Sequence, residues 1–184
     1  MLLDHAKLGV RLMVSLYDAA IPGYLRMLRN VASFLDKAEA HAAAGGVDPQ
    51  TYLAVRLTDD MHPLLNQLQM ISDGAKGGAA RLAGVEPPSF ADDETTWAQA
   101  KARIAKTIAF VESIKPEQVS EDESRIITLK FPNGAMNFTA RDFVFQFSLP
   151  NFQFHVVTAY GLLRKAGVPL GKMDYLAGAT LQPA

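Results

Sequence analysis

Two polar residues in an apolar segment near the end of the chain have a spacing that could support chemistry. Asn151 and His155 lie four positions apart within LPNFQFHVVTAYGLLRKAGVP, residues 149–169. Positions four apart are neighbours on one face of a helix, so the two side chains could share one ion or hydrogen-bond to each other. Pro150 has no N–H to donate to the carbonyl of Gln146, which predicts a kink and an unpaired acceptor beside the pair.

This pair has two interpretations. In the functional one, Asn151 and His155 belong to a polar pocket that binds a metal or a small ligand. In the structural one, a buried histidine is satisfied by Asn151 or by a backbone carbonyl, because buried polar groups generally find hydrogen-bond partners. The two residues taken by themselves favour the structural interpretation.

His62 is the second candidate for a functional histidine. We expect it in the first turn of a helix, where His62, Asn66, Gln69 and Asp73 recur at intervals of four, three and four. A polar stripe of this kind beside an apolar face is typical of a solvent-exposed flank. His62 would therefore matter for function only if the last helix meets it at the mouth of the bundle.

Other kinds of chemistry find little support in the sequence. No serine has the context of a nucleophile elbow and no glycine-rich loop follows a strand, so acyl transfer and nucleotide binding are poorly supported. The chain has no cysteine, which excludes disulfides, thiolate metal ligands and a cysteine nucleophile. Lysine and arginine number 18 against 19 acidic residues, so no positive excess exists to attract nucleic acid. The glycine-rich stretch SDGAKGGAARLAG lies inside a helical pattern, and we interpret it as a close helix contact.

The sequence gives no sign of a membrane partner. No apolar run reaches the roughly 18 residues that a spanning helix needs. The beginning, MLLDHAKLGVRLM, is too polar for the apolar core of a secretory signal. We therefore expect a cytoplasmic protein.

Hydrophobic periodicity predicts four long helices. Apolar residues from Tyr17 to Ala42 alternate at intervals of four and three, with Pro22 in the first full turn and Gly45-Gly46 as the stop. Asp48-Pro49 would begin a short helical connection. The further helices are one capped by Asp59 or Asp60 and ending at Gly84, one beginning at Asp92 or Asp93 and stopping before Pro116, and the last, which carries the Asn151 and His155 pair.

A short hairpin precedes the last helix. In RIITLKFPNGAMNFTARD, apolar residues alternate on both sides of Asn133-Gly134, a dipeptide that accepts the positive φ angles of tight turns. Thr139 and Asp142 have the spacing of a capping box for the helix that follows. The fold class is therefore all-α, a four-helix bundle with a small inserted β-hairpin. Loops of some ten residues permit a topology other than up-down-up-down.

The order of several sequence blocks resembles a bacterial family of unknown function within the DinB/YfiT-like metalloenzyme superfamily. The blocks are MVSLYDAAIPGYLRMLRNVASFLDKAEAH, LTDDMHPLLNQLQMISDGAKGGAARLAGVEPP, TIAFVES and LPNFQFHVVTAYGLLRKAGVPLGKMDYL. The resemblance runs from Met13 to about Leu176 and implies a DinB-like bundle that is often dimeric. Because family members typically begin near Met13, we interpret residues 1–12 as an extension from an upstream start codon and residues 13–184 as one DinB-like domain.

The resemblance also implies a metal site. Better-studied relatives hold a divalent metal with three histidines, one from the second helix and two from an H-x-x-x-H pattern on the last, and some perform thiol-dependent transferase or isomerase chemistry. Aligning the superfamily's leucine-arginine and terminal glycine with Leu163, Arg164 and Gly167 fixes the H-x-x-x-H pair. Its second histidine then falls on His155 and its first on Asn151.

Two functional hypotheses follow, and the sequence does not decide whether the protein is an enzyme. Asparagine offers a weak neutral oxygen where imidazole would give a strong nitrogen ligand, so zinc or nickel should bind less well here than at three histidines. We favour a metal-independent protein that binds a small, partly apolar ligand near Asn151, His155 and His62. The alternative is a transferase or hydrolase in which the same residues weakly hold a divalent ion that activates water. A homodimer is expected from the resemblance alone.

Overall fold

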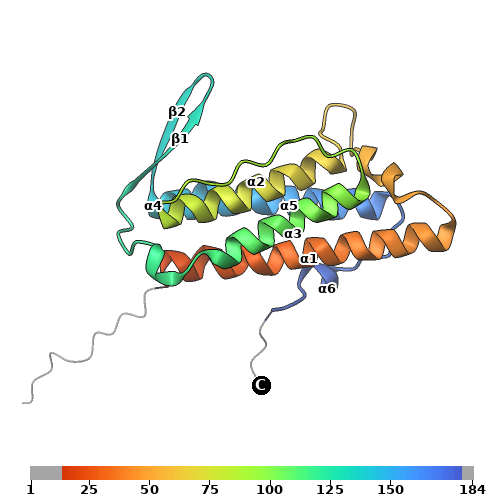
Figure 1. Cartoon of the computed structure of the whole chain (residues 1–184), viewed down its shortest axis with the longest axis horizontal. Helices are drawn as coiled ribbons and strands as arrows, with labels where there is room; N and C mark the ends of the chain where they lie inside the picture. Colours follow the sequence, from red (N-terminus) through yellow and green to blue (C-terminus); the bar gives the residue numbers. More distant parts are fainter. Residues whose placement is uncertain (1–13, 180–184) are drawn as a thin grey trace, which may run out of the picture.

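The computed structural model describes residues 14–179, and the expected N-terminal extension, residues 1–12, lies outside this range. Four long helices form an elongated bundle, as predicted (Figure 1). No helix within the described range is long and apolar enough to cross a membrane. The long helices are α1 (Leu16–Gly45), α2 (Leu64–Ala83), α3 (Trp97–Ser113) and α5 (Leu149–Lys165).

The bundle does not have the simple up-down-up-down order. α1 and α5 run in one direction and α2 and α3 in the other, because the segment 84–96 returns along the length of the bundle before α3 begins (Figure 1). A long crossover connection of this kind is one of the known variations of four-helix bundles. This connection places α2 against both α3 and α5, so α2 has an interface with each of these two helices.

The first helix is set by its cap and by its buried stripe. The Ser15 hydroxyl accepts a hydrogen bond from the backbone N–H of Asp18 at 3.0 Å, and the helix ends at Gly46. Its inward residues, which include Tyr24 and Phe34, are fully buried. Pro22 lies inside α1, one turn deeper than predicted, because the cap at Ser15 starts the helix earlier.

The second helix begins later than the sequence suggested. Pro63 occupies the N-cap position, and neither Asp59 nor Asp60 caps the helix. The backbone N–H of Leu64 donates instead to the carbonyl of Val55, at the end of η1 (Pro49–Ala54), for which Asp48 is the cap as predicted. A proline fits at a helix start because its missing N–H costs nothing there. His62 therefore lies in the loop before α2 and not in its first turn.

The predicted start of α3 at Asp92 or Asp93 was also wrong. Thr96 caps α3 through a capping box with Gln99, whereas Asp92 and Glu94 bind the guanidinium of Arg103. The segment 84–96 covers only part of the polar stripe of α2: Gln69 is 6% exposed and donates to Glu94 at 2.9 Å, whereas His62 and Asp73 are exposed. Sequence periodicity describes helix faces but not which loop will cover them.

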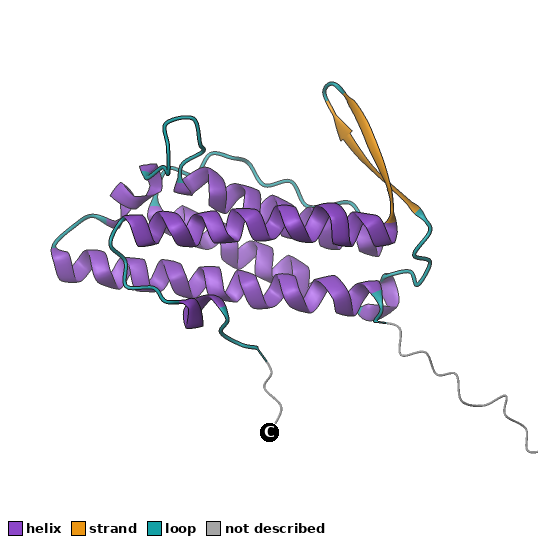
Figure 2. Cartoon of the chain, turned by 180° about the vertical axis from the view of Figure 1, so that it is seen from behind, coloured by secondary structure: helices purple, strands orange, loops and turns teal. Residues whose placement is uncertain are grey.

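The hairpin is present as predicted and projects from one end of the bundle (Figure 2). Strands β1 (Ile126–Phe131) and β2 (Gly134–Thr139) pair antiparallel around the two-residue loop Pro132-Asn133. Of the predicted Asn-Gly pair, only Gly134 has a positive φ, at 142°, a value that suits glycine. Ile127 and Leu129 face inward and are buried. Shorter elements are η2 (Pro116–Gln118) and α6 (Lys172–Tyr175).

The last long helix is assembled from three consecutive segments. Thr139 caps α4 (Ala140–Asp142) by accepting the N–H of Asp142 at 3.0 Å, as expected. A π-helical segment, η3 (Phe143–Ser148), follows and leads into α5. The irregularity expected at Pro150 is therefore a wider turn placed just before the proline, where the regular hydrogen-bond ladder changes.

Candidate functional site

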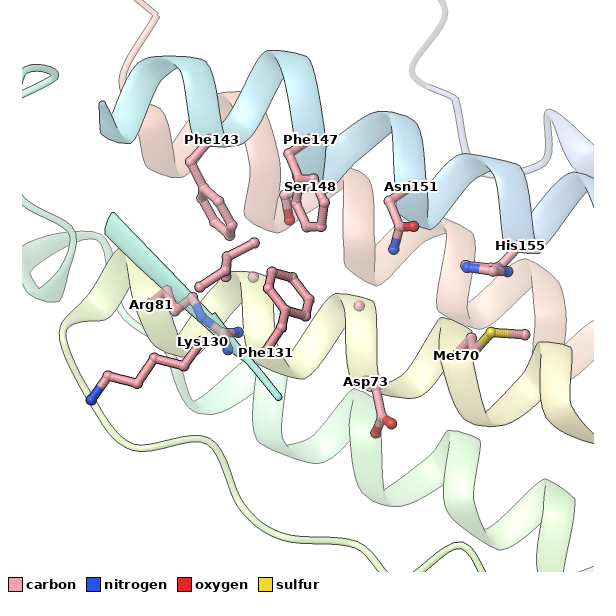
Figure 3. Close-up of a pocket in the computed structure, with 13 residues that line it drawn as sticks. Met70, Asp73, Arg81, Lys130, Phe131, Phe143, Phe147, Ser148, Asn151 and His155 are labelled. Carbon is pink, nitrogen blue, oxygen red and sulfur yellow. The ribbon is translucent and has the colours of Figure 1, made fainter. Parts of the chain in front are cut away.

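A cavity of about 350 Å³ lies between α2, the consecutive helices η3 and α5, and strand β1 (Figure 3). Phe131, Phe143 and Phe147 line its hairpin end, and Asn151 and His155 line the other end. The cavity thus joins an aromatic wall to two polar groups. Its other lining residues are Met70, Asp73, Gly74, Gly78, Arg81, Leu129, Lys130 and Ser148.

The π-helical segment positions the residues of the α5 wall. The backbone N–H of Leu149 donates to the carbonyl of Val144, five residues earlier. One wider turn rotates every later side chain around the helix axis relative to a continuous α-helix. Such turns are frequent at functional sites. Here the turn lies directly between the aromatic residues of η3 and the polar residues of α5.

Small residues on α2 form the floor of the cavity. A Cβ atom at Gly78 would lie 2.6 Å from the hydroxyl of Tyr24 and 2.7 Å from that of Ser148, so glycine is required for this approach. These two hydroxyls hydrogen-bond to each other at 2.6 Å. Burial raises the pKa of Tyr24 to about 12, which keeps the phenol neutral. The glycine-rich stretch therefore serves close packing of α2 on its neighbours, as the sequence suggested.

A hydrogen-bond chain fixes the tautomer of His155. Gln67 Nε2 donates to the backbone carbonyl of His62 at 3.3 Å, so the amide oxygen of Gln67 faces the imidazole. That oxygen lies 2.8 Å from His155 Nδ1. Since an amide oxygen only accepts, Nδ1 must carry the proton and donate it. His155 Nε2 is then a hydrogen-bond acceptor.

His155 is kept uncharged near neutral pH. Burial lowers the pKa of its imidazole, and the positive charge of a protonated His62 lowers it further. The neutral ring can accept a hydrogen bond through Nε2 without first losing a proton. The partner of the histidine is a glutamine from α2, whereas the sequence had suggested Asn151 or a backbone carbonyl.

The three candidate residues have different positions. Asn151 and His155 are both half-buried and line the same cavity, consistent with their four-residue spacing (Figure 3). His62 is exposed in the loop before α2 and is not a lining residue. Its connections to the site are its carbonyl, which orients Gln67, and its electrostatic effect, which lowers the pKa of His155.

The residues present do not match a three-histidine metal centre. Among residues 14–179, no group of three or more His, Cys, Asp or Glu side chains is arranged to hold an ion. His155 would supply one imidazole nitrogen and Asn151 a weak amide oxygen. Stable zinc sites use three or four strong nitrogen, sulfur or carboxylate ligands. The metal site that the superfamily resemblance implies is therefore not supported by this donor set.

Sequence reasoning missed two residues of the site. Gln67 is 88 positions from His155, and no local pattern links them. Arg81 lies on α2 at the hairpin end of the cavity (Figure 3), and its position depends on how β1 crosses the bundle. Asp73 also lines the cavity, but its carboxylate is bound to Arg103 at 2.9 Å and to Lys76 at 3.0 Å.

Comparison with known proteins places the chain within a family. The family profile described as a domain of unknown function, DUF1993, matches residues 16–176. A crystal structure of a DinB family member from Shewanella denitrificans is similar in fold, with a TM-score of 0.83 and 35% sequence identity. The similarity covers 92% of this chain and 96% of that one. No curated protein sequence matches the chain.

Proposed function

Because the chain belongs to the DUF1993 family and is DinB-like in fold, we propose that it binds a small, partly apolar ligand in the cavity between α2, α5 and the hairpin. The observation that carries this proposal is the pairing of Asn151 with a neutral, oriented His155 in a cavity walled by phenylalanines. Ligand sites commonly combine apolar walls with a few well-placed polar groups. The proposal assigns no catalytic step.

The polar groups define what the ligand should present. Neutral His155 offers an acceptor at Nε2, and the Asn151 amide offers both a donor and an acceptor. A hydroxyl or amide group on the ligand can hydrogen-bond to both His155 and Asn151. The rest of the ligand would pack on Phe143 and Phe147, where each square ångström of apolar surface removed from water contributes about 25 cal/mol.

Two further expectations belong to the proposal. We propose that the protein is cytoplasmic, with neither nucleic acid nor membrane as a partner, on the grounds of its near-neutral charge balance and apolar runs that are too short. We also propose a homodimer, for which the exposed apolar face of α5 gives a physical reason.

NMR titration with 3-phenylpropanamide tests the ligand proposal, since this probe carries a phenyl ring and one neutral amide. We expect the backbone signals of Phe147, Asn151 and His155 to shift together. Asn151→Leu, which keeps the volume but removes the amide, should weaken binding about fivefold, the effect of one neutral hydrogen bond. Gln146→Leu, an exposed residue earlier on the same helix, is the matched control. Binding that Asn151→Leu leaves unchanged contradicts the proposal.

A further inference from the structure

Arg81 gives the cavity a positive group that the proposed function does not use. We infer that the ligand carries an anionic group, a carboxylate or a phosphate, which Arg81 binds at the hairpin end of the cavity. The inference rests on the proposed function and extends it from a neutral to an acidic class of ligand.

Arg81 is half-buried as a whole residue and lines the cavity (Figure 3). Within residues 14–179, it makes no ion pair and no side-chain hydrogen bond. By contrast, Arg103 lies on α3, which packs against α2, and it is bound to the carboxylates of Asp73, Asp92 and Glu94. An arginine beside a cavity with its five donors unused is suited to a bidentate acid ligand.

No acidic group in the cavity neutralises Arg81. The titratable residues that line it are Asp73, Arg81, Lys130 and His155. The Asp73 carboxylate points away from Asn151 and is already bound to Arg103 and Lys76 (Figure 3). His155 is neutral, and Lys130 contributes mainly its stem, with its ammonium directed outward (Figure 3). The local field at the aromatic end is therefore positive and attracts an anion.

Gly77 makes room for the guanidinium. A Cβ atom at this position would lie 2.5 Å from Arg81 Nη1. Residues four apart share one helix face, so the arginine folds back over Gly77 toward the cavity. A glycine inside a helix costs about 1 kcal/mol relative to alanine, and here it permits a defined side-chain position.

A cationic group, aromatic rings and neutral polar groups follow one another in this order along the cavity. Arg81 lies at one end, Phe131 and Phe147 lie between, and Asn151 and His155 lie at the other end (Figure 3). Because the guanidinium of Arg81 lies over Gly77, the rise along α2 from Met70, near His155, to the level of the guanidinium is about 10 Å at 1.5 Å per residue. An elongated acid with an apolar middle and a neutral polar end fits this arrangement.

A matched set of phenyl probes tests the inference on the full chain. The set is 3-phenylpropionate, 2-phenylethyl phosphate, neutral 3-phenylpropanamide and 3-phenylpropylammonium, with dissociation constants measured by NMR titration. At least one of the two anions should bind about tenfold more tightly than the amide, as expected for a charge-assisted hydrogen bond, and the cation should bind most weakly. Comparison of the two anions tells which acid group is preferred.

Two variants isolate Arg81. Arg81→Gln should remove the preference for anions, so that neither anion binds more tightly than the amide. Gly77→Ala should reduce the preference by displacing the guanidinium while keeping its charge, and it also covers the case in which Arg81→Gln does not fold. Arg164→Gln, an exposed arginine on α5, removes the same charge elsewhere and should keep the preference.

The outcomes separate the two proposals. If the amide binds as tightly as both anions, or if the anion preference survives Arg81→Gln and Gly77→Ala, the inference about an acidic ligand is wrong and the ligand site stands. If no probe shifts the signals of Phe147, Asn151 and His155, the proposed function fails as well.

Discussion

At the scale of single residues, the site depends on which atom of His155 carries the proton. Gln67 accepts from Nδ1 because its own amide nitrogen is committed to the carbonyl of His62. One backbone carbonyl therefore determines, through one glutamine, that His155 presents an acceptor. A change at Gln67 should alter the histidine without any change at the cavity wall.

Replacing Gln67 with glutamate should raise the pKa of His155. A carboxylate beside Nδ1 favours the charged imidazole and opposes the lowering by burial and by His62. NMR titration of the imidazole resonances gives the pKa in both proteins. Gln118→Glu adds the same charge at an exposed position and should have no effect. A pKa of His155 that does not rise in Gln67→Glu would contradict the hydrogen-bond chain.

The lowered pKa of His155 also predicts a pH dependence of the free energy of unfolding. The pKa of His155 in the folded protein lies below the ordinary value of 6.5. The unfolded chain therefore binds the proton first as the pH falls, so the unfolding free energy decreases from pH 6.5 down to the lower folded pKa and stays reduced below it. Above pH 6.5 both states are neutral and this residue adds no slope. In urea unfolding, His155→Gln should lose less unfolding free energy than the wild type as the pH falls through this window. An equal loss in the two proteins would contradict the lowered pKa of His155.

At the scale of elements, close approach of helices forms the cavity floor. A Cβ atom at Gly78 would collide with the hydroxyls of Tyr24 on α1 and Ser148 on η3, so three helical segments meet at one glycine. At Gly74, one turn earlier, an added Cβ atom would make only ordinary contacts with α5, the shortest being 3.8 Å to Phe152. Glycine is therefore required at position 78, whereas position 74 of the same helix has room for a Cβ atom.

Gly78→Ala should destabilise the protein by about 1–3 kcal/mol, because the added methyl group overpacks a buried ring that cannot move freely. Gly74→Ala should be neutral or stabilising, since it gains helix propensity without a close contact. Urea unfolding monitored by circular dichroism gives both free energies. Equal stability of the two variants would show that the floor is not tightly packed at Gly78.

The buried Arg103 of α3 binds the segment 84–96 at several points. Arg103 is 2% exposed and binds Ala91 O at 3.0 Å as well as Asp92 and Glu94, each at 2.9 Å. Arg103→Ala should lower the unfolding free energy by about 3 kcal/mol, since it leaves a shielded carboxylate without its cation. It should also speed proteolysis within residues 84–96. Lys106→Ala, an exposed change on the same helix, should do neither. A stable, protease-resistant Arg103→Ala protein would refute this role.

At the scale of the whole molecule, much of the fold could be predicted and much of the site could not. Four helices and the hairpin follow from local periodicity and turn residues, which depend on neighbours in the chain. The Asn151 and His155 pair followed from helical spacing. The start of α2 was missed because Pro63, not an aspartate, begins that helix. Gln67 and Arg81 were missed because their roles arise from contacts between distant segments.

The outer face of α5 predicts self-association. Phe154 is 57% exposed and Val157 is 52% exposed, and Gly161 has open space where a side chain would be. Contiguous apolar surface of this kind often marks an interface, and identical chains commonly pair through the same surface. We propose this face as the dimer contact.

Light scattering tests the dimer contact. The wild type should have twice the monomer mass, and the double variant Phe154→Arg, Val157→Arg should be monomeric because four added charges would face one another. Met173→Arg is the control, since Met173 is more exposed but lies on α6. A monomeric wild type, or a dimeric double variant, would contradict the proposal.

The most direct test of the central claim is to locate a bound probe. In an isotope-filtered NOE experiment with 3-phenylpropanamide, the phenyl protons should give contacts to the ring protons of Phe143 and Phe147. The amide end should contact Hε1 of His155. Contacts from the probe solely to residues outside the cavity, such as the exposed face of α5, would contradict a ligand site between α2, α5 and the hairpin.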